Sequence, residues 1–117
     1  MKNNFFYKSQ FSNIYKKSSK ISEITSQILY GERFKILSKN KDWIKIKSSF
    51  DNYIGYIKNE KYVNRHDPSH KVYSLKAIIF NKQNKKTKRF LPFGSKVSTI
   101  NKNKKFLEFE KNKWLKI

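Results

Sequence analysis

An internal repeat sets the strongest limit on the folds open to this chain. Residues 27–47 (QILYGERFKILSKNKDWIKIK) align without a gap with residues 90–110 (FLPFGSKVSTINKNKKFLEFE), 63 positions further on. Gly31 then aligns with Gly94, and Trp43 aligns with Phe106. A repeat of this length indicates that one folding unit occurs twice. We therefore expect two copies of a unit of about 50 residues.

Each copy has the pattern of short β-strands. In the first copy, apolar residues alternate with polar ones in segments 33–38 and 43–47, and a third strand is expected at 53–57 around a glycine. The polar, serine-rich segment 16–27 is expected to form a long loop after the first strand. Several short strands joined by close turns favour a small barrel over a sandwich.

Six short motifs of the first copy occur in the order typical of bacterial SH3-like (SH3b) domains. They are NIY (13–15), the long loop, SQILYGERFKIL (26–37), DWIKIK (42–47), YIGYI (53–57) and KY (61–62). The first copy therefore resembles an SH3b domain. Two such copies in tandem, with LPFGSKV (91–97) in the second, resemble the N-terminal region of NlpC-type cysteine peptidases. That resemblance implies a role in hydrolysing cell-wall peptides between γ-D-glutamate and a diamino acid.

The resemblance implies an all-β fold with two small SH3-like barrels in tandem, of which the second is expected to lack its last strand. The expected boundaries are an N-terminal extension (1–11), a first barrel (12–63), a linker (64–71) and a second barrel (72–117). Ile117 aligns with Asn59, so the counterparts of the last residues of the first copy are missing. We expect a fragment of a longer protein, or alternatively a natural short protein whose second barrel is open.

The chain lacks the residues that carry catalysis in such a peptidase. It contains no cysteine, which excludes a cysteine nucleophile, a disulfide and a thiolate metal site within it. His66 and His70 flank Pro68, which disfavours the helix that would bring both rings to one metal ion. We therefore expect a non-catalytic chain without cofactor or metal. The partners implied by the resemblance are a downstream peptidase domain and the stem peptide of peptidoglycan.

The resemblance also implies a ligand-binding role for Glu32 and Tyr53. In peptidases of this type, the first SH3b domain faces the catalytic cleft and helps to select stem peptides with a free N-terminal L-Ala. The Glu32 carboxylate is expected to emerge at the barrel rim and bind that ammonium group, with Tyr53 as the aromatic contact. Alternatively, Glu32 is a surface residue paired with Lys35 or Arg33. Its counterpart in the second copy is Ser95, so the carboxylate belongs to the first copy alone.

Two further aromatic residues are candidate contacts for a sugar or a peptide. They are Trp43 and Tyr56, and Trp114 is the counterpart of Tyr56 in the second copy. The alternative for these rings is packing between the barrel and a loop.

The chain carries a formal net charge of +20, with 25 lysines but only three arginines. Its lysines are spread along the whole chain, and base reading favours the planar fork of arginine, so a solvated lysine surface is one interpretation. Contact with nucleic acid or with an anionic cell-wall polymer is the other, and residues 84–89 form the densest positive run. No secretory signal or membrane-spanning apolar run is visible, which predicts a cytoplasmic chain without membrane contact.

Overall fold

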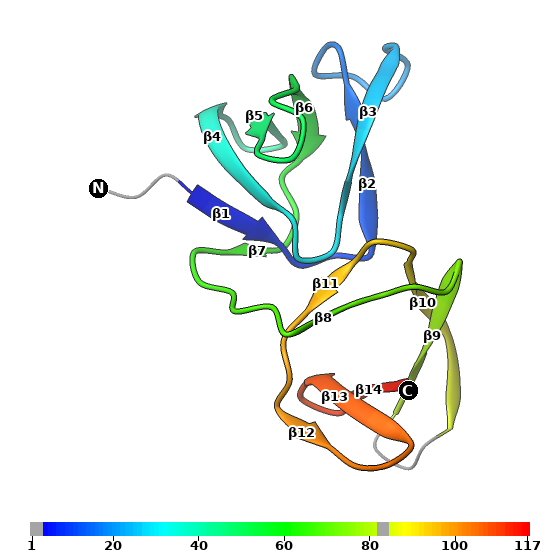
Figure 1. Cartoon of the computed structure of the whole chain (residues 1–117). Helices are drawn as coiled ribbons and strands as arrows, with labels where there is room; N and C mark the ends of the chain where they lie inside the picture. The colour runs from blue at the N-terminus through cyan, green and yellow to red at the C-terminus, as the bar shows by residue number, and fades with distance from the viewer. Residues whose placement is uncertain (1–3, 82–84) are drawn as a thin grey trace. The chain divides into compact units, whose positions relative to one another are not determined.

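The computed structural model describes residues 4–81 and 85–117, and it divides into two compact units, Met1–His66 and Asp67–Ile117. Every regular element in the described part of the chain is a β-strand, which confirms the expected all-β class (Figure 1). A helix with the length and hydropathy needed to cross a membrane is not found among these residues.

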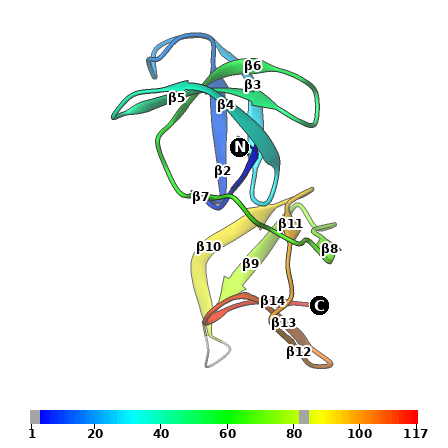
Figure 2. The same ribbon diagram turned by 90° about the vertical axis from the view of Figure 1, so that its left-hand side faces the viewer.

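Unit 1 is built on one seven-stranded antiparallel sheet. Its strands are β1 (Asn4–Tyr7), β2 (Phe11–Tyr15), β3 (Ile24–Leu29), β4 (Arg33–Lys39), β5 (Trp43–Ser48), β6 (Ile54–Lys58) and β7 (Tyr62–Val63). Their order in the sheet is β3-β2-β6-β5-β4-β1-β7. The sheet bends strongly, so that β4, β5 and β6 run crosswise to β2 (Figure 2). The edge strands are β3 and β7, and in the described residues no ladder joins them to close the barrel.

The core of unit 1 consists of side chains that the strand alternation turns to one face of this sheet. They are Tyr7, Ile14, Ile28, Phe34, Ile44, Ile46 and Ile57. On β5, for example, Ile44 and Ile46 are buried, whereas Trp43, Lys45 and Lys47 are partly exposed. This is the period-two pattern that a strand with one buried face requires.

Residues 4–7 lie inside the sheet, within the segment expected to be an N-terminal extension. β1 pairs with β4 on one side and with β7 on the other, and Tyr7 is 1% exposed. The Phe5 ring contacts the ring of Tyr62 edge to face, with centroids 5.1 Å apart. A four-residue strand whose partners lie far along the chain has too weak a local pattern to be recognised from sequence. Residues 1–3 of that segment lie outside the described residues.

The long loop expected at residues 16–27 is shorter than predicted. Residues 24–27 belong to β3, which pairs with β2 along its length, and the Thr25 hydroxyl donates a hydrogen bond to the Ile14 carbonyl at 3.2 Å. The prediction was wrong here because β3 is an edge strand with one solvated face. Its serine, threonine and glutamine residues therefore have the composition of a loop.

Unit 2 contains a five-stranded and a two-stranded antiparallel sheet, of order β10-β9-β14-β13-β12 and β11-β8. The strands are β8 (His70–Lys71), β9 (Lys76–Phe80), β10 (Lys86–Pro92), β11 (Lys96–Val97), β12 (Asn101–Lys102), β13 (Phe106–Glu110) and β14 (Lys113–Lys116). Its buried apolar residues are Val72, Ile79, Phe80, Leu91, Val97, Leu107, Phe109 and Leu115.

The segment expected to be a linker, residues 64–71, contains β8, and the backbone hydrogen bonds identify β8 as the counterpart of β1. In each unit, one residue exchanges two backbone hydrogen bonds with the turn around the repeated glycine. In unit 1 these bonds run from Tyr7 N to Glu32 O and from Gly31 N to Tyr7 O, and in unit 2 from Val72 N to Ser95 O and from Gly94 N to Val72 O. Each copy therefore begins with a strand that precedes the boundary drawn from sequence.

Candidate functional site

The turn that carries the candidate acid is the same in both units. Gly31 and Gly94 have φ angles of 82° and 92°, a left-handed conformation that glycine adopts without the steric cost of a side chain. In unit 1 this turn connects β3 to β4, and in unit 2 it connects β10 to β11. The repeated glycine is therefore required by the backbone of the turn.

Glu32 follows this turn, and its side chain lies inside unit 1. It is 9% exposed, and its Oε1 accepts a hydrogen bond from the Leu29 backbone N–H at 2.8 Å. In unit 2 the counterpart Ser95 is fully buried, and its hydroxyl donates to the Pro92 carbonyl at 2.8 Å. In both units the residue after the glycine thus bonds back to the residue three positions earlier. The expectation that the carboxylate emerges at the rim was wrong, because the turn holds it inward.

Tyr53 lies at the same end of the sheet as Glu32. Its side chain is 41% exposed, and its carbonyl accepts a hydrogen bond from the Ser48 N–H at 2.8 Å. The next residue, Ser49, donates its N–H to the carbonyl of Arg33 at 3.0 Å. The Ser48–Ser49 backbone therefore lies between Tyr53 and the start of β4, where Glu32 is located.

Trp43 and Tyr56 lie on the outer face of the sheet, opposite the core. Their chain neighbours Ile44 and Ile57 are core residues, so alternation turns both rings outward. The Trp43 ring meets Tyr15 edge to face, with centroids 5.7 Å apart and an interplanar angle of 88°. Tyr56 is paired in register with Tyr15 on β2. The three rings form one aromatic row across β2, β6 and β5, outside the core.

Two lysines lie over this aromatic row. The Lys58 Nζ is 5.8 Å from the centroid of the Trp43 ring, and the Lys45 Nζ is 6.0 Å from that of Tyr56. Both separations are at the outer limit of a cation–π contact. Sequence reasoning did not select these lysines, although the alternation of lysine and isoleucine on β5 already placed Lys45 on the outer face.

The remaining polar candidates do not gather into one site. The His66 ring packs against Phe6 and Tyr30, with centroid distances of 5.6 and 6.1 Å. His70 Nδ1 lies 2.9 Å from the Ser69 hydroxyl. Within the described ranges there is no cluster of three or more His, Cys, Asp or Glu residues that could hold a metal ion.

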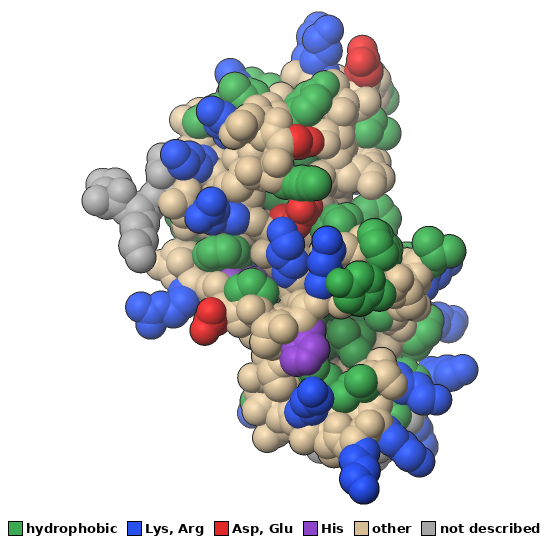
Figure 3. Space-filling view, viewed as in Figure 1, with side chains coloured by type: hydrophobic (Ala, Val, Ile, Leu, Met, Phe, Trp, Pro, Cys, Tyr) green, Lys and Arg blue, Asp and Glu red, His purple; other side chains and the backbone are tan. Residues whose placement is uncertain are grey.

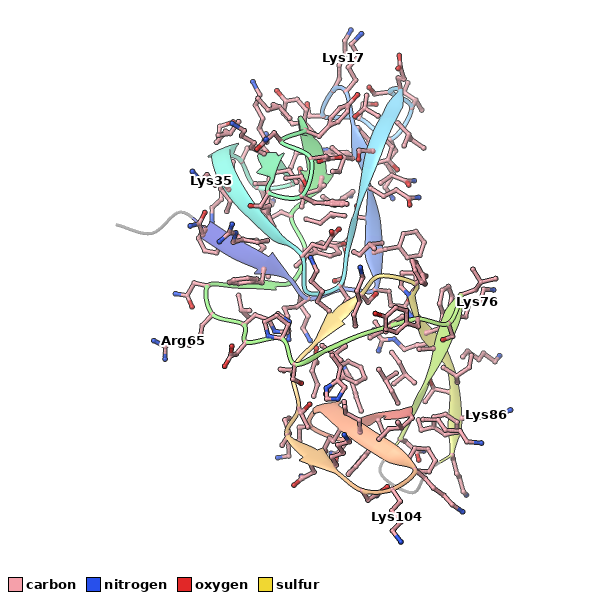
Figure 4. All side chains as sticks on the ribbon, in the orientation of Figure 1. Lys17, Lys35, Arg65, Lys76, Lys86 and Lys104 are labelled. Atoms are coloured by element: carbon pink, nitrogen blue, oxygen red, sulfur yellow. The ribbon has the colours of Figure 1, made fainter. Side chains whose placement is uncertain are left out.

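Lysine and arginine side chains are distributed over both units. On the face shown in Figure 3 they occur in many places rather than in one patch. The labelled basic residues of Figure 4 extend away from the ribbon; they are Lys17, Lys35, Arg65, Lys76, Lys86 and Lys104. The positive run at 84–89 was expected in a loop, but residues 86–89 form the start of β10. Its first residue, Asn84, lies outside the described residues.

The strongly bent antiparallel sheet of unit 1 and its short strands define a small all-β module of the SH3-like class. Residues 14–61 match the family model described as the bacterial dipeptidyl-peptidase SH3 domain. The match runs from the core residue Ile14 to Lys61, just before β7, and supports an SH3b domain in unit 1. Comparison with curated proteins and with solved structures gave no significant match.

Proposed function

We propose that this chain is the non-catalytic SH3b region of an NlpC-type cell-wall peptidase, and that unit 1 binds the amino end of peptidoglycan stem peptides. The observation that carries the proposal is the match of residues 14–61 to an SH3 domain of bacterial dipeptidyl-peptidases. A dipeptidyl-peptidase releases a dipeptide from the amino end of a chain, so its substrate has a free ammonium group. Unit 1 has an acid and an exposed phenol at one end of its sheet.

The buried position of Glu32 suits the recognition of a cation. Its carboxylate is oriented by the Leu29 N–H, so little side-chain entropy is lost when a ligand binds. Glu32 keeps 9% of its surface exposed, and in this proposal the ammonium group approaches from that side and forms a charge-assisted hydrogen bond with the carboxylate. In a partly buried site such a bond is less weakened by water than on an open surface. The exposed ring of Tyr53 offers a second contact for the same ligand.

Hydrolysis requires groups that this chain does not supply. A cysteine peptidase needs a thiolate nucleophile, and the chain contains no cysteine. We therefore assign the bond-breaking step to a peptidase domain that acts together with this chain, and substrate binding to unit 1. The ligand is a muropeptide fragment with a free L-Ala end, of the kind that forms during cytoplasmic recycling of the cell wall.

Titration calorimetry with two synthetic peptides tests this assignment. The peptide L-Ala-γ-D-Glu-diaminopimelate is compared with its N-acetylated form, which lacks the ammonium charge. A hydrogen bond to a charged group contributes about 1.5–3 kcal/mol, so acetylation should weaken binding by roughly 10- to 150-fold. Glu32→Gln should remove most of this difference, because its amide oxygen still accepts the Leu29 N–H but carries no charge.

The matched control is Glu23→Gln, which removes an exposed acid from the same unit. It should leave the preference for the free amino end unchanged. Equal affinity of the wild-type chain for both peptides, or a preference that survives Glu32→Gln, would show that Glu32 does not bind the ammonium group.

A further inference from the structure

On the outer face of the β5–β6 hairpin in unit 1, every pair of residues that lie opposite each other contains one lysine. The three outward-facing pairs are Trp43 with Lys58, Lys45 with Tyr56, and Lys47 with Ile54. Each pair thus joins one lysine to one aromatic or aliphatic side chain. We call these six residues the lysine ladder. The ladder lies opposite the core face, since the alternating residues between them are buried.

Unit 2 provides an internal comparison. The corresponding β13–β14 pairs are Phe106 with Lys116, Glu108 with Trp114, and Glu110 with Lys113. Two lysines and two glutamates sum to no net charge there, whereas the three lysines of unit 1 sum to +3. Glu110 also forms an ion pair with Lys113 at 3.1 Å. The charge of the ladder is therefore particular to the first copy.

The aromatic part of this face is present in both copies. Phe80 and Phe106 of unit 2 meet edge to face with centroids 5.2 Å apart, as Tyr15 and Trp43 do in unit 1 at 5.7 Å. The two copies thus share the rings and differ in charge. A general excess of lysine in the chain does not explain this difference, because unit 2 has glutamates at the same paired positions.

The spacing of the ladder suits an extended polyanion. Residues that face the same side of a strand are two positions apart, or about 6.8 Å in an antiparallel sheet. Three paired positions then extend over roughly 14 Å. Partly exposed Trp43 and Tyr56 side chains alternate with the cations along this length. Proteins that bind single-stranded nucleic acid without sequence preference combine a positive surface along the backbone with aromatic rings on which bases stack.

We propose that the lysine ladder of unit 1 binds single-stranded nucleic acid. Its lysines contact phosphates, and Trp43 and Tyr56 stack on bases. An acidic peptide of Asp and Glu and a polyol phosphate polymer both lack a regular series of aromatic bases on which these rings could stack, so the rings favour a nucleic acid. The ladder has no arginine, and binding is expected to be independent of base sequence. This site uses none of the residues assigned to the amino end of a stem peptide.

Fluorescence anisotropy with the full chain and a labelled oligothymidylate tests the proposal. Trp43→Ala should weaken binding about 5- to 150-fold, since stacking contributes about 1–3 kcal/mol per base. The double variant Lys45→Gln/Lys47→Gln should reduce the slope of log K against log salt by about 0.7 for each phosphate that the chain no longer neutralises. The two lysines are partly exposed, so this variant keeps the fold even if Trp43→Ala does not.

The matched control is Lys113→Gln/Lys116→Gln, which removes the same charge from the corresponding hairpin of unit 2. It should change the affinity and the salt slope less than the ladder variant does. Equal effects of the two double variants would overturn the proposal, because they would indicate general attraction to a basic chain. An abasic strand, inorganic polyphosphate or an anionic cell-wall polymer that binds as tightly as oligothymidylate would also overturn it, because no stacking would then occur.

The calorimetric titration with the stem peptide tests the role of Glu32 independently of nucleic-acid binding by the lysine ladder. The ladder variants should bind the stem peptide as the wild-type chain does. Absence of oligothymidylate binding alone would contradict the ladder site, and absence of a preference for a free amino end alone would contradict the role of Glu32.

Discussion

Substitution of Gly55 by alanine tests whether the bend of unit 1 depends on one close approach between strands. Gly55 is buried on β6, where that strand crosses β2. An added Cβ would lie 2.8 Å from the Tyr15 carbonyl oxygen and would also collide with the Cγ2 of Ile14. Neither neighbour can move easily, because Ile14 is a fully buried core residue and the Tyr15 oxygen belongs to the backbone. The collision must separate β2 from β6.

The expected loss of stability follows from this crowding. Overpacking in a well-filled core costs about 1–3 kcal/mol. Alanine recovers about 0.5–1 kcal/mol through the lower entropy of the unfolded chain. Taking the middle of both ranges, we expect Gly55→Ala to lower the free energy of unfolding of unit 1 by about 1 kcal/mol. For a domain of this size that corresponds to a fall in Tm of roughly 4–8 °C.

The assay is urea and thermal unfolding followed by the fluorescence of Trp43. The chain has two tryptophans, so the measurement is made in a Trp114→Phe background in which Trp43 reports on unit 1 alone. Ile54→Ala is the control, because it changes an adjacent residue that is 49% exposed, and it should cost less than about 0.5 kcal/mol. A Gly55→Ala chain as stable as the wild type would show that β2 and β6 can separate without cost, and that the bend does not depend on their close contact at Gly55.

Three further predictions concern the stability of each unit. Gly31→Ala and Gly94→Ala should each cost about 1–2 kcal/mol in urea unfolding, because both φ angles are positive, and similar losses would support a shared turn. Burial, and secondarily the charge of Glu60, raises the pKa of Tyr7 to about 12 from an ordinary value of 10.0. The unfolded chain therefore loses this proton first, and stability should fall between pH 10 and 12 by about 1.4 kcal/mol per pH unit, a slope that Tyr7→Phe should remove. Asn112, with φ of 62°, should accept glycine at little cost and lose about 1 kcal/mol with valine, as followed by Trp114 fluorescence.

The candidate site shows where local sequence patterns are sufficient. Alternation on β5 placed Ile44 and Ile46 in the core and Trp43 on the opposite face, because side chains of a strand point alternately to its two sides. The resemblance to SH3b domains depended on short segments of this kind, and the family match over residues 14–61 covers them except for Asn13 and Tyr62. Alternation could not reveal that Tyr15 lies beside Trp43, since the two residues come from strands far apart in the chain.

The direction in which the Glu32 side chain points could also not be predicted from the sequence. A glutamate after a glycine at a strand start can point outward or fold back on its own turn, and both are sterically allowed. The structure selects the second, with the Leu29 N–H as one partner of the carboxylate. In unit 2 the side chain after the glycine also bonds to the residue three positions earlier, but there the Ser95 hydroxyl donates to the Pro92 carbonyl.

Local sequence patterns predicted an all-β chain with a repeated segment, a glycine turn in both copies, and a carboxylate after the turn of the first copy alone. These features are local or arise from a gapless repeat, so they can be recognised without knowing which strands meet. Long-range strand pairing, visible only in the folded chain, places β1 and β8 at the start of the two units and β3 at the edge of its sheet. It also decided which outward rings and lysines share a face. Each of these depends on pairing between segments distant in the chain, where the free energy comes from shared burial and hydrogen bonds that no single segment encodes.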